Sequence, residues 1–139
     1  MFPKPYVGYV YGTRCSTKNL SSAAWETYAP TDELVSFQGI FTNHSTTIIV
    51  EYNTVIKLLS DSISCGICYL FFRLDLNLMV LHLNNFYLVR IPTMLCMFLR
   101  VHLLERHFDY IEYQHVPRFL NTLIYALANY VLGIYLQHL

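Results

Sequence analysis

Hydrophobic and polar positions divide this chain into two unequal parts. Residues 1–53 mix Gly, Pro, Ser and Thr with scattered aromatic residues, whereas from Thr54 onward Leu, Ile, Phe, Tyr, Met and Val dominate. A run of roughly 20 apolar residues is long enough to cross a bilayer as a helix. The pattern therefore predicts an N-terminal extension over residues 1–53, soluble or bound at an interface, and a membrane anchor over residues 54–139.

Three apolar segments of the anchor predict transmembrane helices at about residues 55–73, 85–110 and 118–137. The last is the clearest, because the stretch from Phe119 to Gln137 contains no Asp, Glu, Lys or Arg and begins soon after Pro117. A buried helix in a soluble complex is the alternative interpretation of this segment. The expected fold is an all-α membrane protein with three transmembrane helices and an irregular N-terminal extension.

The other two segments are interrupted by polar residues. Lys57 and Asp61 stand four residues apart near the start of the first segment, so their charges can face each other on a helix. The second segment contains Pro92, where we expect a kink. Basic residues are more numerous on the side of the N-terminus, which places that terminus inside by the positive-inside rule.

Composition and charge favour a membrane location. The 139 residues are 55% hydrophobic and only 13% charged, and nine Lys and Arg balance nine Asp and Glu. An ordinary soluble domain carries about a quarter charged residues. Because no basic field is present, we expect no nucleic-acid partner. The first 25 residues contain Lys4, Arg14 and Lys18 but no acid, which weakly resembles a mitochondrial targeting segment and suggests the mitochondrial inner membrane.

The four cysteines include one C-x-x-C pair, Cys65 and Cys68. A structural metal site would need further ligands nearby, and the sequence contains no second pair. The pair lies inside an apolar segment, so we interpret both residues as small hydrophobic packing residues and predict no metal site.

The richest polar stretch, residues 100–110, lies at the end of the second predicted helix. His102 and Arg106 are four residues apart and Arg106 and Asp109 are three apart, so each pair shares a helix face. One interpretation is an anchor at the level of the lipid headgroups. The other is a site for a polar headgroup or a cofactor, since a histidine inside a helical bundle can ligate haem iron.

The order of these features resembles a known family. The pair Asp109-Tyr110 closes the second predicted helix and is followed by a loop with Pro117 and a third predicted helix. This arrangement resembles the small membrane-anchor subunit of succinate dehydrogenase, which is respiratory complex II. The resemblance implies a non-catalytic anchor for the flavoprotein, iron–sulfur and second membrane-anchor subunits, acting in electron transport and the tricarboxylic acid cycle.

The same resemblance implies roles for three residues. Asp109 and Tyr110 would form a ubiquinone site, in which the Tyr110 hydroxyl donates a hydrogen bond to a quinone carbonyl and Asp109 orients that tyrosine or takes part in proton delivery. Phe98 stands where the family usually has its haem-ligating histidine. His102 lies one helical turn further along and is the candidate ligand of haem b.

Two alternatives remain open. The leading one is an accessory structural subunit of another mitochondrial respiratory complex, without a cofactor. Its residues 1–53 would bind neighbouring subunits, and Val7–Tyr11 and Thr46–Tyr52 have the residue types of strands. The other is a small channel or transporter, which no inverted repeat supports. No nucleophile elbow, phosphate loop or metal-ligand spacing predicts catalytic residues or an independent enzyme.

Overall fold

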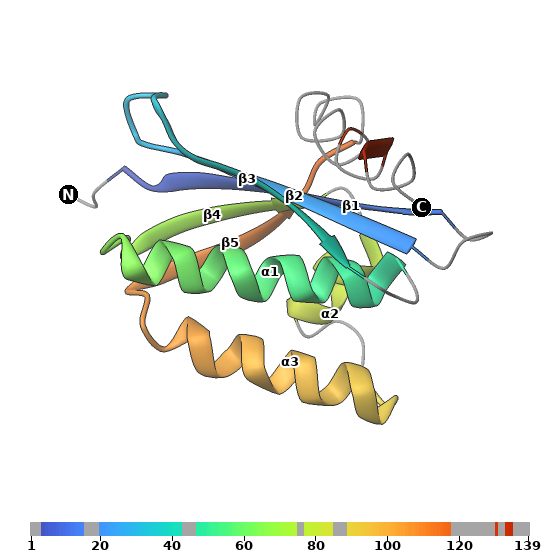
Figure 1. The fold of residues 1–139 in the computed structure, drawn as a ribbon. Helices are drawn as coiled ribbons and strands as arrows, with labels where there is room; N and C mark the ends of the chain where they lie inside the picture. The colour runs from blue at the N-terminus through green and yellow to red at the C-terminus, as the bar shows by residue number, and fades with distance from the viewer. Residues whose placement is uncertain are drawn as a thin grey trace.

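The computed structural model describes residues 4–15, 20–42, 47–74, 77–84 and 89–117, together with 130, 133 and 134. These residues form a mixed sheet with helices layered on one side (Figure 1). The strands are β1 (Tyr6–Cys15), β2 (Leu20–Tyr28), β3 (Leu34–Thr42), β4 (Tyr69–Leu74) and β5 (Tyr110–His115). The helices are α1 (Thr47–Ser64), α2 (Asn77–Leu83) and α3 (Pro92–Glu105).

The strands lie in the order β3-β2-β1-β4-β5. β1, β2 and β3 are consecutive antiparallel strands, whereas β4 is parallel to β1 and β5 is parallel to β4. From β1 the chain adds β2 and then β3 on one side. It then returns through α1 and adds β4 and β5 on the other side of β1. Residue 53, near which the composition changes, lies inside α1, and strands from both sides of it pair in one sheet.

The core lies between the sheet and α1. Leu70, Phe72 and Leu74, at alternate positions of β4, are fully buried. A β-carbon at Gly8 in β1 would lie 3.2 Å from both terminal methyl carbons of Leu58 in α1. The lack of a side chain at Gly8 therefore lets the helix approach the sheet closely at this point.

α3 packs against α1, so that the sheet, α1 and α3 form successive layers (Figure 1). Val101 of α3 is fully buried. The outer side of this helix keeps an apolar stripe exposed at intervals of four residues, formed by Ile91, Leu95, Leu99 and Leu103. The apolar composition of this region thus reflects one packed face and one exposed face of a short helix.

The prediction of an all-α protein with three transmembrane helices is wrong. The segment expected at 55–73 is a helix only as far as Ser64, because the chain turns at Gly66, whose φ is 75°, and residues 69–74 form β4. β4 is paired on both sides, with β1 and β5. Interior parallel strands are continuous apolar runs, which composition does not separate from buried helices.

The segment expected at 85–110 contains α3, but that helix is 14 residues long, and Pro92 begins it instead of kinking it. Of the helix predicted at 118–137, only residues 130, 133 and 134 lie within the described part of the chain. None of the helices in that part is long and apolar enough to cross a membrane. The strand predicted at Val7–Tyr11 is confirmed as part of β1, whereas the one at Thr46–Tyr52 is wrong, because α1 begins at Thr47.

Candidate functional site

The topology of the sheet marks one end of it as the natural place for a ligand. β1 and β4 are parallel neighbours. The strands that follow β1 in the sequence lie on one side of this pair and the strand that follows β4 lies on the other, so the strand order reverses between β1 and β4. In open α/β sheets, ligands bind outside the carboxyl ends of the strands at such a reversal. We call this region the carboxyl edge. It comprises the ends of β1, β4 and β5, the first two turns of α1, and α2.

Glu51 is an acidic side chain that the structure places at the carboxyl edge. Leu58 packs near the start of β1, so the first turns of α1 lie toward the other end of that strand (Figure 1). Glu51 is in those turns and is only 1% exposed. Asp75 directly follows β4 in the sequence but lies outside the described residues. β1 contributes no carboxylate, because its ten residues include neither Asp nor Glu.

A buried pair of side chains joins α1 to α2 at the same edge. The Tyr52 hydroxyl lies 3.1 Å from Nδ1 of His82. Burial raises the pKa of Tyr52 to about 12 and lowers the pKa of His82 below its usual 6.5. At neutral pH the hydroxyl therefore stays protonated and the imidazole stays neutral, and the imidazole tautomer sets which of the two groups donates. The side-chain amide of Asn84 donates to the carbonyl of Tyr113 at 3.2 Å, which ties the end of α2 to β5.

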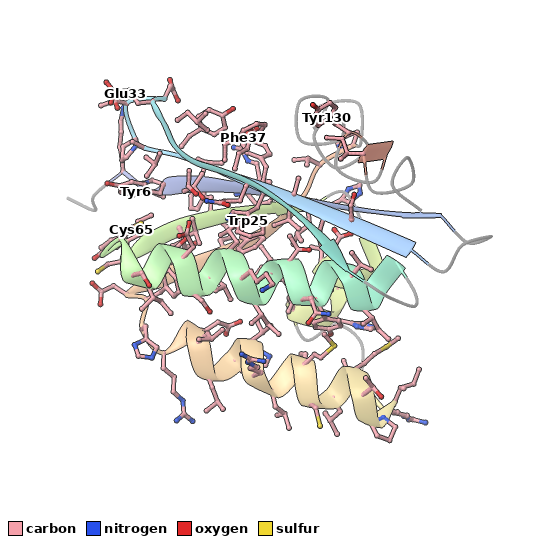
Figure 2. All side chains as sticks on the ribbon, viewed as in Figure 1. Tyr6, Trp25, Glu33, Phe37, Cys65 and Tyr130 are labelled. Atoms are coloured by element: carbon pink, nitrogen blue, oxygen red, sulfur yellow. The ribbon has the colours of Figure 1, made fainter. Side chains whose placement is uncertain are left out.

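The two ends of the sheet differ in charge. Arg14 lies in the last part of β1, and Arg90 precedes α3, whose first turn is on the same side (Figure 1). The opposite end, where Figure 2 labels Glu33 and Cys65, carries more acids than bases. Its charged residues include Lys4, Asp32, Glu33, Asp61, Arg106 and Asp109. At the carboxyl edge Arg14 and Arg90 are accompanied by the buried Glu51, so the excess of basic residues there is small.

The residues predicted to bind ubiquinone lie at that opposite end. Asp109 and Tyr110 are both exposed, and Tyr110 is 47% exposed, so its ring is not enclosed as a quinone site requires. Their backbone N–H groups donate to the carbonyl of Cys68, at 2.9 and 3.2 Å. Cys65 and Cys68 flank the turn between α1 and β4 and are both exposed. The prediction that this pair packs inside an apolar segment is therefore wrong.

The predicted haem ligand, His102, takes part in a network that fastens α3 to β5. Nδ1 of His102 lies 2.8 Å from Oε2 of Glu105, three residues along the helix. The Tyr113 hydroxyl donates to Oε1 of the same carboxylate at 2.6 Å. Burial raises the pKa of Tyr113 well above its usual value, so this hydroxyl remains a donor. The structure does not bring His102, Asp109 and Tyr110 together around a common cavity.

Neither protein-family models nor curated proteins match this sequence. The fold, in contrast, matches solved structures over nearly the whole chain. The RNase H1 of the halophilic archaeon Halobacterium salinarum is 23% identical, with a TM-score of 0.87, over 93% of this chain and 98% of its own. The N-terminal RNase H domain of a Mycobacterium tuberculosis protein is 20% identical, with a TM-score of 0.90, over 98% of this chain and 99% of that domain. The chain has an RNase H-like fold.

A third RNase H-like structure was solved with a ligand. LC11-RNase H1, in complex with an RNA/DNA hybrid, is 18% identical to this chain, with a TM-score of 0.87, over 94% of this chain and 99% of its own. This likeness conflicts with the prediction that nucleic acid is no partner, which rested on net charge alone. The net charge does not show how basic and acidic residues are distributed between the two ends of a neutral molecule.

The RNase H-like fold also overturns the identification as a succinate dehydrogenase anchor subunit. The structures that resemble the chain are RNase H1 domains. The expected complex II partners, the ubiquinone and haem b cofactors, and the multi-pass placement in the mitochondrial inner membrane are therefore wrong. An accessory subunit of another respiratory complex is likewise unsupported. The error arose because apolar runs belonging to a buried strand and a packed helix were interpreted as membrane spans.

RNase H-like folds usually use divalent metal ions. Such ions bind several oxygen ligands at once, many of them carboxylates. Within the described residues, no group of three or more His, Cys, Asp or Glu side chains could hold a metal. Glu51 by itself is not a sufficient donor set, and β1 adds no acid to it. The described residues therefore do not fit a metal centre, and we derive no metal-dependent step for them.

Glu51, Tyr52 and His82 were missed because each was attached to the wrong element. The first two ended a stretch interpreted as a strand, and His82 interrupted a stretch interpreted as part of the membrane anchor. One signal could have found them. Tyr52, Val55 and Leu59 recur at intervals of three and four residues, as on the buried face of an amphipathic helix. That helix would have placed Glu51 beside the sheet.

Proposed function

We propose that this chain binds nucleic-acid duplexes of the RNA/DNA hybrid type at its carboxyl edge. The observation that carries the proposal is the RNase H-like fold over nearly the whole chain, with one such structure solved in complex with a hybrid. The reversal of strand order between β1 and β4 supports the location, since ligands of open α/β sheets bind there. The proposal concerns binding, because the described residues support no hydrolytic step.

A hybrid duplex offers two features that the carboxyl edge can use. Its phosphates form a dense row of negative charge, and its RNA strand carries 2′-hydroxyls that distinguish it from DNA. Arg90 is exposed at this edge, and the backbone of Arg14 lies in the last part of β1. Because these cations are few, we expect the logarithm of the binding constant to fall with the logarithm of salt concentration by a slope of only roughly −2.

Equilibrium binding to a short fluorescently labelled hybrid tests the proposal. Anisotropy titrations would be run in low salt, and then competed with unlabelled hybrid, DNA duplex and RNA duplex of the same sequence. We expect the hybrid to compete best, because only it combines the 2′-hydroxyls of one strand with a deoxyribose partner strand. No saturable binding, or equal competition by all three duplexes, would contradict the proposal.

The same samples would be incubated with Mg²⁺ and with Mn²⁺ and the strands separated on a denaturing gel. From the described residues we expect both strands to stay intact. Metal-dependent cleavage of the RNA strand would keep the hybrid as ligand but add a nuclease activity, with ligands recruited from residues such as Asp75 that lie outside the described part of the chain.

A further inference from the structure

A pocket of about 380 Å³ lies between β2, α1 and α3, and Asn53 in the second turn of α1 brings its lining to the border of the carboxyl edge. Its lining residues are Trp25, Asn53, Ile56, Lys57, Ser60 and Arg100. None of them is acidic, and two of them are basic. A pocket of this volume falls in the range that small organic ligands occupy.

The two basic side chains of the pocket come from different helices and have no acidic partner in the described part of the chain. Lys57 of α1 and Arg100 of α3 are both exposed, and neither forms an ion pair with a described residue. Asp61, predicted from its spacing to face Lys57, instead accepts a hydrogen bond from the Ser36 hydroxyl at 3.0 Å. Two like charges that line one pocket repel each other unless an anion lies between them.

Trp25 adds a mostly buried aromatic side chain to the lining of the same pocket. Its side chain lies between the sheet and α1 and is only 6% exposed (Figure 2). The indole Nε1–H is buried and has no hydrogen-bond acceptor among the described residues. This nitrogen has almost no accessible surface, so a ligand in the pocket would contact the indole ring and not the N–H group. The Ser60 hydroxyl is already used, since it donates to the carbonyl of Ile56 at 2.8 Å.

We propose that this pocket binds the phosphate group of a phosphate monoester. Lys57 and Arg100 would neutralise the phosphate, and the Trp25 ring would lie beside the bound group. Phosphate fits better than a carboxylate because its several anionic oxygens can accept from donors on two helices at once. The pocket is larger than a phosphate ion, which leaves room for an organic group beside Ile56 and the indole. The inference rests on this pocket and not on hybrid binding at the carboxyl edge.

Trp25 is the only tryptophan of the chain, which makes the test direct. Its fluorescence and its single indole N–H resonance both report on this pocket. The intact chain would be titrated with inorganic phosphate and with ribose 5-phosphate at constant ionic strength, with ribose as the uncharged control. We expect a saturable shift of the indole resonance with both phosphates and none with ribose.

Matched variants then separate the pocket from general surface charge. Lys57→Gln and Arg100→Gln change exposed side chains and should fold normally, which circular dichroism would verify. Each should weaken phosphate binding by about tenfold or more, the loss expected for one charge-assisted hydrogen bond. Arg106→Gln changes an exposed arginine at the end of α3 that does not line the pocket, and it should bind phosphate as the unaltered chain does.

Two results would overturn the proposal. An indole resonance that phosphate leaves unmoved would overturn it, and so would equal titration of the Arg100→Gln variant and the unaltered chain. A hybrid duplex that competes with phosphate for the indole response would identify a nucleic-acid strand as the source of the phosphate. Hybrid binding without competition would identify a free monoester. A failure of hybrid binding alone would contradict the proposed function and leave this pocket standing.

Discussion

Arg73 in β4 donates a hydrogen bond to the Tyr9 hydroxyl in β1 at 2.6 Å, across the parallel pair where the strand order reverses. Its guanidinium also lies over the Tyr9 ring, 5.5 Å from the ring centroid. Nε of Arg73 donates to Oε1 of Gln114 in β5 at 3.1 Å. One side chain thus links three neighbouring strands. The two parallel strands that end at the candidate site are held in register partly by this link.

Tyr9→Phe tests the strength of that link. The variant keeps the aromatic ring and its edge contact with Tyr28, 5.9 Å between centroids, and removes only the hydroxyl. We expect the free energy of unfolding to fall by about 1 kcal/mol, a typical net value for a partly buried hydrogen bond. Urea denaturation would measure it. Tyr110→Phe, at a half-exposed tyrosine, is the control and should change stability by less than about 0.5 kcal/mol.

Gly8→Ala tests the close approach of α1 to the sheet. The added methyl would lie 3.2 Å from both Leu58 methyl carbons, in a part of the core where Leu58 is fully buried. We expect a loss of about 1–3 kcal/mol from overpacking. Gly133→Ala meets no atom within 4 Å and should not destabilise. In a double-mutant cycle, Leu58→Ala should cost less in the Gly8→Ala background than alone, whereas strict additivity would argue against the contact.

The Tyr52–His82 pair predicts a stability that depends on pH. Burial lowers the pKa of His82 in the folded chain below its usual 6.5, so below that pH the unfolded chain binds more protons than the folded one. The contribution of the pair is therefore complete above pH 6.5 and declines as the pH falls below it. Unfolding midpoints measured across this range should decline less steeply for His82→Asn. His107→Asn, at an exposed position after α3, should keep the original profile.

Glu26 in β2 predicts the opposite dependence on pH. The Glu26 side chain is buried, and its Oε2 has no hydrogen-bond partner among the described residues. Burial raises the pKa of Glu26 above 4.5, and a hydrogen bond with Tyr28 offsets part of this rise. Between 4.5 and the folded pKa the folded chain binds more protons, so stability declines as the pH rises through that window. Glu26→Gln should therefore be more stable than the unaltered chain at neutral pH, with the gain shrinking toward pH 4.5. The control is Glu33→Gln, at an exposed position. If Glu26→Gln leaves the unfolding midpoint at neutral pH unchanged, as Glu33→Gln should, the prediction is contradicted.

Part of the fold follows from the sequence. The strand at Val7–Tyr11 has strand-like residue types, and helices do occur within the segments predicted at 55–73 and 85–110. The large error concerned β4, whose residues 69–74 are apolar except for Arg73 and follow soon after apolar α1. Its less buried face carries Tyr69 and Phe71 as well as Arg73, so the sequence shows little of the polar alternation that would reveal a strand. Its pairing with β1 depends on contacts more than 60 residues apart, which no local pattern encodes.

The candidate site was harder to predict than the fold. Its described residues come from the starts and ends of separate elements, and only the strand order brings Glu51 and His82 to one edge. The polar stretch at residues 100–110 drew attention because its residues are adjacent in sequence. In the structure, His102 and Glu105 of that stretch support the packing of α3 on β5. Density of polar residues along the chain was therefore a poor guide to the site.

The most direct test of the account compares hybrid binding by two charge-reversal variants at opposite ends of α3. Arg90 lies before the first turn of α3, at the carboxyl edge, and Arg106 caps its last turn. Both side chains are exposed. Because both variants change the net charge equally, any difference between them reports the location of the ligand. At one ionic strength, we expect Arg90→Glu to weaken hybrid binding by roughly tenfold and Arg106→Glu by less than about twofold. Equal losses, or a larger loss for Arg106→Glu, would contradict binding at the carboxyl edge.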